Sequence, residues 1–274
     1  TLNHPSEFYG LGLTIGNAEA KLIELANAYA CIARMGEFRP FQLTSSPLNP
    51  NLKFTLSPFP SSAEPEGIKI TSKIKNRAQV FSEDACFLIA DILSDNWARS
   101  LAFGANSSLR FDFPVACKTG TSSDFRDNWA FGFTPEFTVG VWVGNFDGSP
   151  MREVSGVSGA APVLHELFEE LRLRFGTSWY ASPTSIVERW VNPLSGKIVT
   201  ANTPGAVREK FSIDTLPPLA SPDDYDALGR VKLPAEYRDW FASGQNWLAN
   251  QAVLDTRPSE AAPHIITPLP GTTY

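Results

Sequence analysis

The sequence has few of the residues that bind metals or form disulfide frameworks. Its 274 residues include three cysteines and three histidines, widely separated along the chain. Zinc sites and disulfide frameworks require such residues in clusters or at short, regular spacings. We therefore expect no metal site, and we predict that Cys31, Cys86 and Cys117 are buried as small apolar side chains.

A signature of a bound cofactor is missing as well. The stretch Gly10–Gly16 has three glycines, but the last comes one residue later than in the dinucleotide-binding fingerprint. No acidic residue follows at the end of a second strand, where that fingerprint places a ribose ligand. We expect no cofactor and interpret these glycines as the approach to a helix.

The chain also lacks basic clusters and long apolar runs. Its formal net charge is −6, and no block of Lys and Arg is present to bind phosphates, which argues against a nucleic-acid partner. No apolar run reaches the roughly 18–20 residues of a membrane-spanning helix. The first residue is Thr1 and no signal peptide follows it, so we expect a soluble segment of a longer or processed protein.

Apolar periodicity predicts two helices in the first hundred residues. One covers 17–34, with Asn17 as its cap, and the other begins after Ser82, whose side chain is a typical cap. The stretch 44–67 contains five prolines and is predicted to be a loop, and 69–80 is predicted to be extended.

Alternating patterns predict an antiparallel sheet after residue 113. The expected strands cover 114–121, 128–133 and 137–143, and the last two are joined by a tight turn. Glycines in these strands favour close approach of a helix, and a helix is predicted from about Pro162 to Gly176. The expected fold class is α/β (α+β), an antiparallel sheet flanked by helices.

Beyond Gly176 the composition changes. Of the 22 prolines, 11 lie in the last 98 residues, which is typical of an extended path with turns. One short helix is predicted over 234–248, with Tyr237, Trp240 and Phe241 on one face. We interpret this part as an appended linker or small subdomain.

The run Lys118–Thr121, with the sequence Lys-Thr-Gly-Thr, suits acyl-transfer chemistry. Lys118 offers a cation to a carboxylate, and the hydroxyls of Thr119 and Thr121 can bind the same group. Gly120 leaves the strand edge open, and the backbone N–H of Thr121 can face a developing oxyanion. Alone the triplet is a weak signal, since an exposed strand with a solvated lysine looks the same.

The flanking sequence makes the signal specific. Lys118–Asn145, Tyr9–Glu19 and Met151–Pro162 resemble the transpeptidase domain of class A penicillin-binding proteins, most closely their 1C type. The resemblance implies that 1–176 is the C-terminal part of a penicillin-binding transpeptidase domain. It further implies that 177–258 is a proline-rich linker or extension, and that 259–274 begins a small β domain.

The resemblance also implies a function. The parent protein would be a bifunctional peptidoglycan synthase, both glycosyltransferase and D,D-transpeptidase, anchored at the periplasmic face of the bacterial inner membrane. A serine would attack the D-Ala-D-Ala end of a stem peptide, and β-lactams would trap it. Lys118 and Thr121 would be catalytic, Thr119 and Gly120 would bind substrate, and other cell-wall synthesis proteins could be partners.

Literal matches to the family's two other motifs are judged coincidental. Ser72–Lys75 and Ser94–Asn96 have the required letters, but only 22 residues separate Ser72 from Ser94 and 24 separate Ser94 from Lys118. The family places whole helices between these motifs. We therefore expect the nucleophilic serine upstream of residue 1 and predict that the chain alone is inactive.

Two alternatives remain open. The chain could be a self-contained serine hydrolase that uses Ser72, Ser94 and Lys118, or a non-enzymatic scaffold that docks cell-wall proteins through 177–274.

Asp124 and Asp127, which follow Lys118–Thr121 in the sequence, are interpreted as turn-capping residues paired locally with Arg126.

Three aromatic and sulfur side chains beside the run are assigned to packing. Trp129 and Trp142 are expected to pack, and Cys117 is expected to point away from the ligand side of Lys118.

Overall fold

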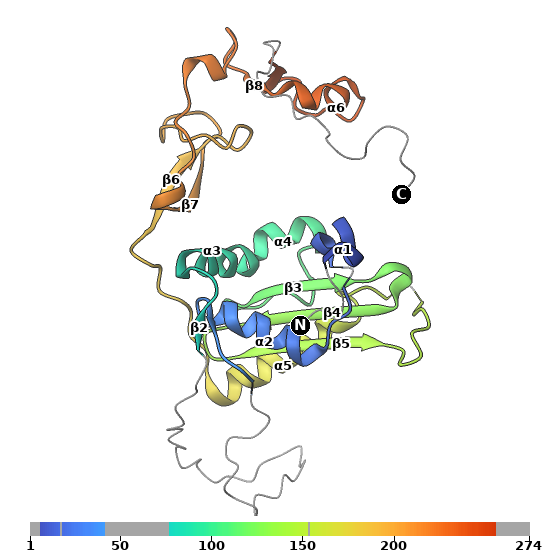
Figure 1. Cartoon of the computed structure of the whole chain (residues 1–274). Helices are drawn as coiled ribbons and strands as arrows, with labels where there is room; N and C mark the ends of the chain where they lie inside the picture. The colour runs from blue at the N-terminus through green and yellow to red at the C-terminus, as the bar shows by residue number, and fades with distance from the viewer. Residues whose placement is uncertain (1–5, 17, 42–76, 153, 256–274) are drawn as a thin grey trace, which may run out of the picture. The chain divides into compact units, whose positions relative to one another are not determined.

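The computed structural model describes residues 6–16, 18–41, 77–152 and 154–255. The chain divides into two compact units, Thr1–Pro183 and Thr184–Tyr274, and each is described by itself. Figure 1 shows the first unit in blue to yellow and the second in orange to red. The three-domain division expected from the sequence stays a prediction.

The first unit is built on a three-stranded antiparallel sheet with the order β3-β4-β5. β3 covers Ala116–Thr121, β4 Asp127–Phe133 and β5 Thr138–Gly144, each within two residues of the predicted strands. Thr134 closes the turn between β4 and β5, because its hydroxyl accepts the backbone N–H of Phe137 at 3.2 Å. In the described part of the chain β3 is an edge strand of this sheet, because β4 is its one neighbour.

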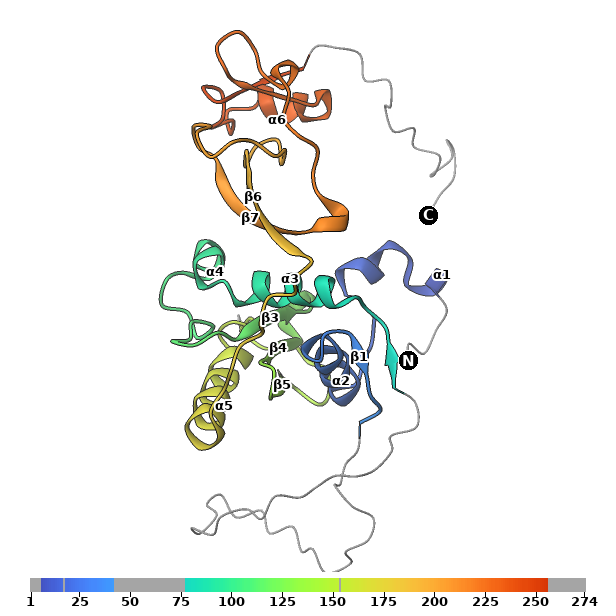
Figure 2. The ribbon, with the colours of Figure 1, turned by 90° about the vertical axis from the view of Figure 1, so that its left-hand side faces the viewer.

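Helices cover both faces of this sheet. α2 (Leu22–Ala33) packs on one face, and α5 (Ala160–Phe175) packs on the other; Figure 2 shows the sheet edge-on between them. A Cβ atom added at Gly132 would lie 2.6 Å from the Phe168 ring of α5. The glycine thus permits the close helix approach that the sequence predicted.

The core of the first unit consists of two clusters of buried side chains, one on each face of the sheet. Between the sheet and α5 lies a cluster of buried side chains that includes Cys117, Ala130, Leu164 and Phe168. A smaller cluster on the other face joins Ala116 and Phe133 to residues of α2 and of α3 (Glu83–Ser94). Ser82 caps α3 as predicted, since its Oγ accepts the backbone N–H of Ala85 at 3.2 Å.

The first predicted helix begins later than expected. The structure has a short helix α1 (Ser6–Tyr9) and a 3-10 helix over Gly10–Ile15, and α2 starts only at Leu22. Lys21 has an extended backbone with φ −82° and ψ 140°, so helical bonding cannot continue through it. Asn17, the predicted cap, lies outside the described residues, as do the predicted loop 44–67 and most of the predicted extended segment 69–80. The end of that segment forms β2 (Ala78–Gln79), which pairs with β1 (Glu37–Phe38).

The second unit carries two small sheets. β6 (Ile186–Val191) and β7 (Val207–Ser212) pair antiparallel, and β8 (Val231–Leu233) and β9 (Ala252–Leu254) pair in parallel. The helix predicted over 234–248 is much shorter. Only a 3-10 turn and α6 (Arg238–Ala242) form, because Ser243 turns extended at φ −76° and ψ 156°.

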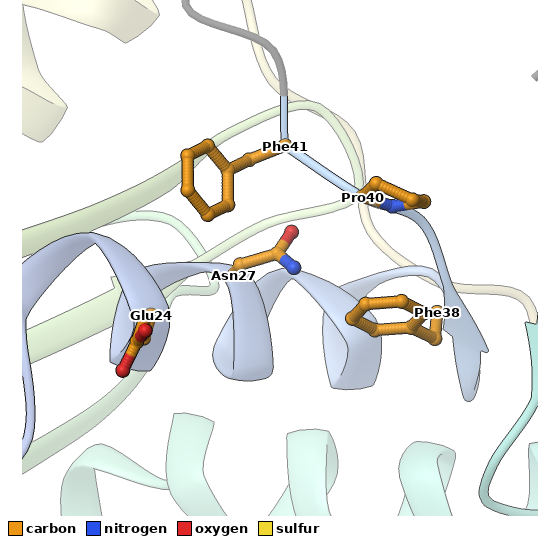
Figure 3. A pocket seen from close by; sticks show the side chains of 5 residues that line it. All are labelled: Glu24, Asn27, Phe38, Pro40 and Phe41. Atoms are coloured by element: carbon orange, nitrogen blue, oxygen red, sulfur yellow. The ribbon is translucent and has the colours of Figure 1, made fainter. Parts of the chain in front are cut away.

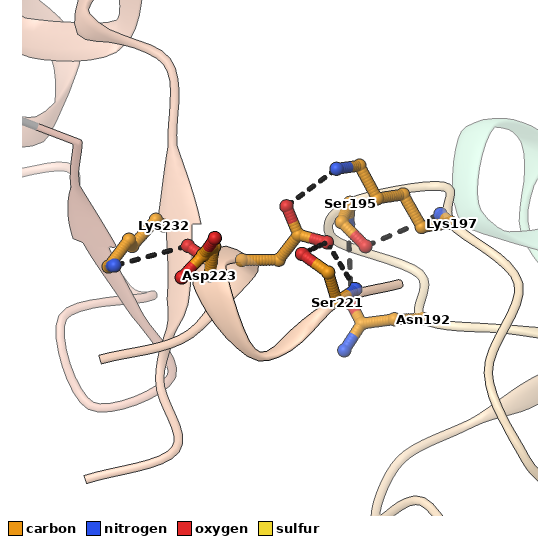
Figure 4. Close-up of polar contacts among 7 residues, drawn as sticks. Asn192, Ser195, Lys197, Ser221, Asp223 and Lys232 are labelled. Carbon is orange, nitrogen blue, oxygen red and sulfur yellow. Dashed lines mark hydrogen bonds and ion pairs between the residues drawn. The ribbon is translucent and has the colours of Figure 1, made fainter. Parts of the chain in front are cut away.

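Polar contacts hold the loops of this unit (Figure 4). Lys197 Nζ lies 2.5 Å from the Asp224 carboxylate, and the Lys197 ammonium lowers the pKa of that carboxyl. The side chain of Asn192 accepts the backbone N–H groups of Leu194 and Ser195 at 2.9 and 3.2 Å. These bonds give the proline-rich region a defined local structure, although composition alone suggested an extended path.

Candidate functional site

The four candidate residues of β3 divide between its two faces. Lys118 pairs with Phe131 and Gly120 with Trp129, so both lie on the face covered by α2, where Tyr29 stacks on Phe131 at 4.6 Å. Thr119 pairs with Ala130 and Thr121 with Asn128. Because neighbouring strand residues point to opposite faces, both threonines lie on the α5 face.

Lys118 is exposed. Its Nζ donates a hydrogen bond to the backbone carbonyl of the next residue, Thr119, at 2.6 Å, and within the described ranges it forms no ion pair. A bond to a neighbouring carbonyl is easily exchanged for a stronger one to an anion. The ammonium is therefore available to a carboxylate that reaches the sheet edge.

The Thr121 hydroxyl is held by a turn distant in sequence. The turn 154–159 precedes α5, and the backbone N–H of Gly156 in it donates to Thr121 Oγ1 at 2.9 Å. Because this bond occupies a lone pair of the oxygen, the hydroxyl proton remains free to donate. The exposed Thr121 can thus accept from the protein while donating to a bound anion.

The turn comes this close only because residue 156 is glycine. A Cβ atom there would lie 2.8 Å from the carbonyl oxygens of both Gly120 and Trp129, which is closer than real Cβ contacts. Gly120 is different, since a Cβ added to it would meet the Trp129 side chain at an ordinary 3.6 Å. Gly156 was not among the residues predicted for the site; the Ser-Gly-Val-Ser-Gly sequence of 155–159 was the available sign of a tight backbone approach.

The connection from β3 to β4 is fixed by local polar bonds. Arg126 forms an exposed ion pair with Asp124 at 3.7 Å, which confirms the local pairing predicted for that aspartate. Asp127 instead accepts the indole N–H of Trp142 at 2.9 Å, while its backbone N–H donates to Ser122 Oγ at 2.8 Å. Both aspartates therefore have structural partners beside the candidate strand.

Cys117 is buried as predicted, with 3% of its surface exposed, in the cluster on the α5 face. Burial raises the pKa of its thiol to about 12, so the thiol is neutral at physiological pH. Trp129 stacks on Phe131 at 6.0 Å, which agrees with the packing role predicted for it.

The second literal serine motif is built into a helix junction. Ser94 is the last residue of α3, and its Oγ donates to the Asp91 carbonyl at 2.9 Å. Asp95 caps α4 (Asn96–Phe103) by accepting the N–H groups of Trp97 and Ala98. Asn96 donates to the Phe111 carbonyl at 2.9 Å. This confirms the predicted position at a helix end, whereas Ser72–Lys75 lies outside the described residues.

A cavity of about 340 Å³ lies elsewhere, between α2 and the chain after β1 (Figure 3). Its lining is Glu24, Asn27, Phe38, Pro40 and Phe41. None of the candidate residues of β3 contributes to it.

In the described ranges there is no cluster of three or more His, Cys, Asp or Glu that could hold a metal ion. None of the helices in these ranges has the length and apolar character needed to cross a membrane.

Comparisons with known proteins point to one group. No family model matches the chain. The chain is 31% identical over 157 residues to penicillin-binding protein 1C of Escherichia coli K12. The aligned stretch covers 57% of this chain and 16% of that protein. It is 32% identical over 126 residues to penicillin-binding protein 1A of Clostridium botulinum strain Langeland, covering 46% and 15%.

A longer match exists to penicillin-binding protein 1A of Rickettsia bellii, 24% identical over 233 residues, covering 82% of this chain and 28% of that protein. A crystal structure of penicillin-binding protein 1A from Haemophilus influenzae matches with a TM-score of 0.54 and 19% identity, covering 76% of this chain and 34% of the other. This likeness confirms the predicted fold class. The chain thus spans between about a seventh and a third of the length of these relatives.

Proposed function

The chain is homologous to class A penicillin-binding proteins, and from this premise we propose that it is part of a peptidoglycan synthase. Within it, β3 is the strand that binds the carboxylate end of a stem peptide during D,D-transpeptidation. The observation that supports this most directly is the arrangement of Thr121, whose hydroxyl accepts from Gly156 and keeps its own proton free to donate.

The chemistry assigns a role to each residue of the strand. A serine attacks the carbonyl of the penultimate D-Ala, the C–N bond to the terminal D-Ala breaks, and that residue leaves as D-alanine. An amine of a second stem peptide then attacks the acyl-enzyme, so the acyl group passes to the amine and the serine is released. Lys118 attracts the terminal carboxylate and Thr119 and Thr121 bind it. The backbone N–H of Thr121 faces the oxyanion, and Gly120 leaves room for the peptide.

We place the nucleophilic serine upstream of this chain. Ser94 is a poor candidate, because it ends α3 and its hydroxyl is bonded to that helix's own backbone. The same proposal gives the parent protein a glycosyltransferase activity, a membrane anchor outside this chain and a periplasmic location. Its ligands are stem peptides and β-lactams, and other cell-wall synthesis proteins are candidate partners.

Intact-mass analysis after incubation with benzylpenicillin tests this proposal. We expect no adduct on the 274-residue chain and a single adduct on a longer form that includes a whole transpeptidase domain. In the longer form, Lys118→Ala should slow adduct formation, and Ser72→Ala should leave it unchanged as the matched control. An adduct on the short chain that Ser72→Ala or Ser94→Ala abolishes would support a self-contained hydrolase instead.

A further inference from the structure

One buried side chain beside the candidate site has no partner. Asn128 is 0% exposed, and neither its amide nitrogen nor its amide oxygen has a hydrogen-bond partner among the residues that the structure describes. Folded proteins pair nearly all buried polar groups, because an unpaired one loses its bonds to water and gains nothing in return. A leucine, which has the same branched shape, would fill the position without that loss.

The position of Asn128 connects it to Thr121. The two residues are partners across the β3–β4 ladder, and both lie on the α5 face. On that face the Asn128 amide lies against the turn 154–159. A Cβ atom at Gly159 would be 3.2 Å from Asn128 Oδ1, and three residues earlier Gly156 donates to Thr121.

The neighbouring helix end has groups that such an amide could serve. α5 begins after Gly159, and no side chain of the described residues caps it. In its first turn Ala161 already donates to the Gly156 carbonyl at 2.9 Å and Pro162 has no N–H, so the N–H of Ala160 is the group that an amide oxygen could accept. Asparagine is among the preferred capping residues, since its amide oxygen accepts the free N–H groups of a first helical turn. Asn128, which lies in β4, therefore places an amide acceptor and an amide donor beside the start of a helix that lacks a side-chain cap.

We propose that Asn128 is a positioning residue for Thr121. Without a ligand on β3, the Asn128 amide is unpaired. When a carboxylate accepts a hydrogen bond from the Thr121 hydroxyl, the turn 154–159 shifts and its polar groups form hydrogen bonds with the Asn128 amide. The bonds formed in the loaded state favour ligand binding, because a ligand shifts an equilibrium only through a difference between the two states. This inference rests on the proposed function of β3.

The test compares Asn128→Leu with the wild-type chain. N-acetyl-D-alanyl-D-alanine is the probe, its C-terminal amide is the ligand control, and binding is followed by NMR at the Gly156 amide. Asn128→Leu should unfold at the same temperature as wild type or higher, because it removes an unpaired buried group. It should also bind the probe about five- to tenfold more weakly, the effect of one typical hydrogen bond.

Thr134→Val is the matched control. Thr134 is a buried polar residue directly after β4, but its hydroxyl bonds to Glu136 and Phe137. This substitution should lower the unfolding temperature and leave probe affinity unchanged. A direct signature is the side-chain amide resonance of Asn128, identified by its loss in Asn128→Leu, which should shift when the wild-type chain binds the probe.

The outcomes separate this inference from the proposed function. If the wild-type chain binds the probe and Asn128→Leu binds it equally well, the role of Asn128 is wrong while the function of β3 stands. A fall in the unfolding temperature of Asn128→Leu with unchanged affinity would show instead that a buried water satisfies the amide. If the wild-type chain does not distinguish the probe from its amide, the proposed function itself is contradicted.

Discussion

The two faces of β3 hold their candidate residues in different ways. On the α5 face, Thr121 is fixed by the Gly156 N–H at 2.9 Å, and glycine at 156 lets the turn touch the backbone of β3 and β4. On the α2 face, Lys118 is exposed, and among the residues that the structure describes its ammonium bonds only to the neighbouring Thr119 carbonyl. One face is prepared for a ligand before it arrives, and the other is free to adapt.

The difference suggests a division of labour. A hydroxyl whose orientation is already set loses little conformational entropy on binding, so it can select ligand geometry. A lysine loses rotamer freedom when it is ordered, but its charge attracts an anion from a distance. We therefore expect Thr121 to determine which carboxylates fit, and Lys118 to determine how strongly any carboxylate is attracted.

The largest effect is expected from Gly156→Ala. The added methyl group would lie 2.8 Å from two backbone oxygens, and backbone cannot move aside as a flexible side chain can. The turn should leave β3 at a cost of about 2–3 kcal/mol in the free energy of unfolding, measured by urea denaturation.

Gly120→Ala is the control for this prediction, because its added methyl would meet only ordinary contacts at 3.6 Å or more. It should change the free energy of unfolding by less than about 1 kcal/mol. Equal losses in the two variants would contradict the contrast between the faces.

Thr121→Val and Lys118→Met sharpen the same contrast. Valine leaves the buried Gly156 N–H without its acceptor, so the free energy of unfolding should fall by about 1–2 kcal/mol. Lys118 is exposed, so methionine should change the free energy of unfolding by less than about 0.5 kcal/mol.

Both variants should bind acetyl-D-alanyl-D-alanine more weakly, but only Lys118→Met should lose the salt dependence of binding. A stability loss at Lys118 as large as that at Thr121 would show that the lysine is structural.

The sequence was sufficient where the determining interactions are local. The three strands follow from two-residue alternation, and Ser82 caps α3 because its hydroxyl oxygen and the backbone N–H that donates to it lie three residues apart. Helix boundaries were less accurate, since the extended backbone of Lys21 and Ser243 is not visible in apolar spacing. Proline content left open whether residues 177–258 are a linker or a small subdomain, and the structure shows that part of that stretch forms paired strands.

The candidate site shows the same limit. The run Lys118–Thr121 could be selected from its residue types and its flanking sequence, and their roles stay predictions. What the sequence did not reveal is the partner of Thr121, because Gly156 is 35 residues away along the chain. The unpaired state of Asn128 was equally hidden, since a single polar residue in a strand pattern is normally assigned to the surface.

The smallest effect is expected at Cys117, which lies next to Lys118 in sequence but on the buried face. Burial raises its thiol pKa from 9.0 to about 12, so the folded state disfavours the thiolate. The resulting stabilisation is complete below pH 9, and it is lost as pH rises from there through the folded pKa, because only the unfolded chain ionises readily. The folded chain should therefore resist alkylation of Cys117 by iodoacetamide at pH 8.5 and react at this position only in urea, as peptide mass analysis would show. Rapid labelling of Cys117 without urea would mean that β3 separates from α5 in solution, and the fixed hydroxyl face would then not exist.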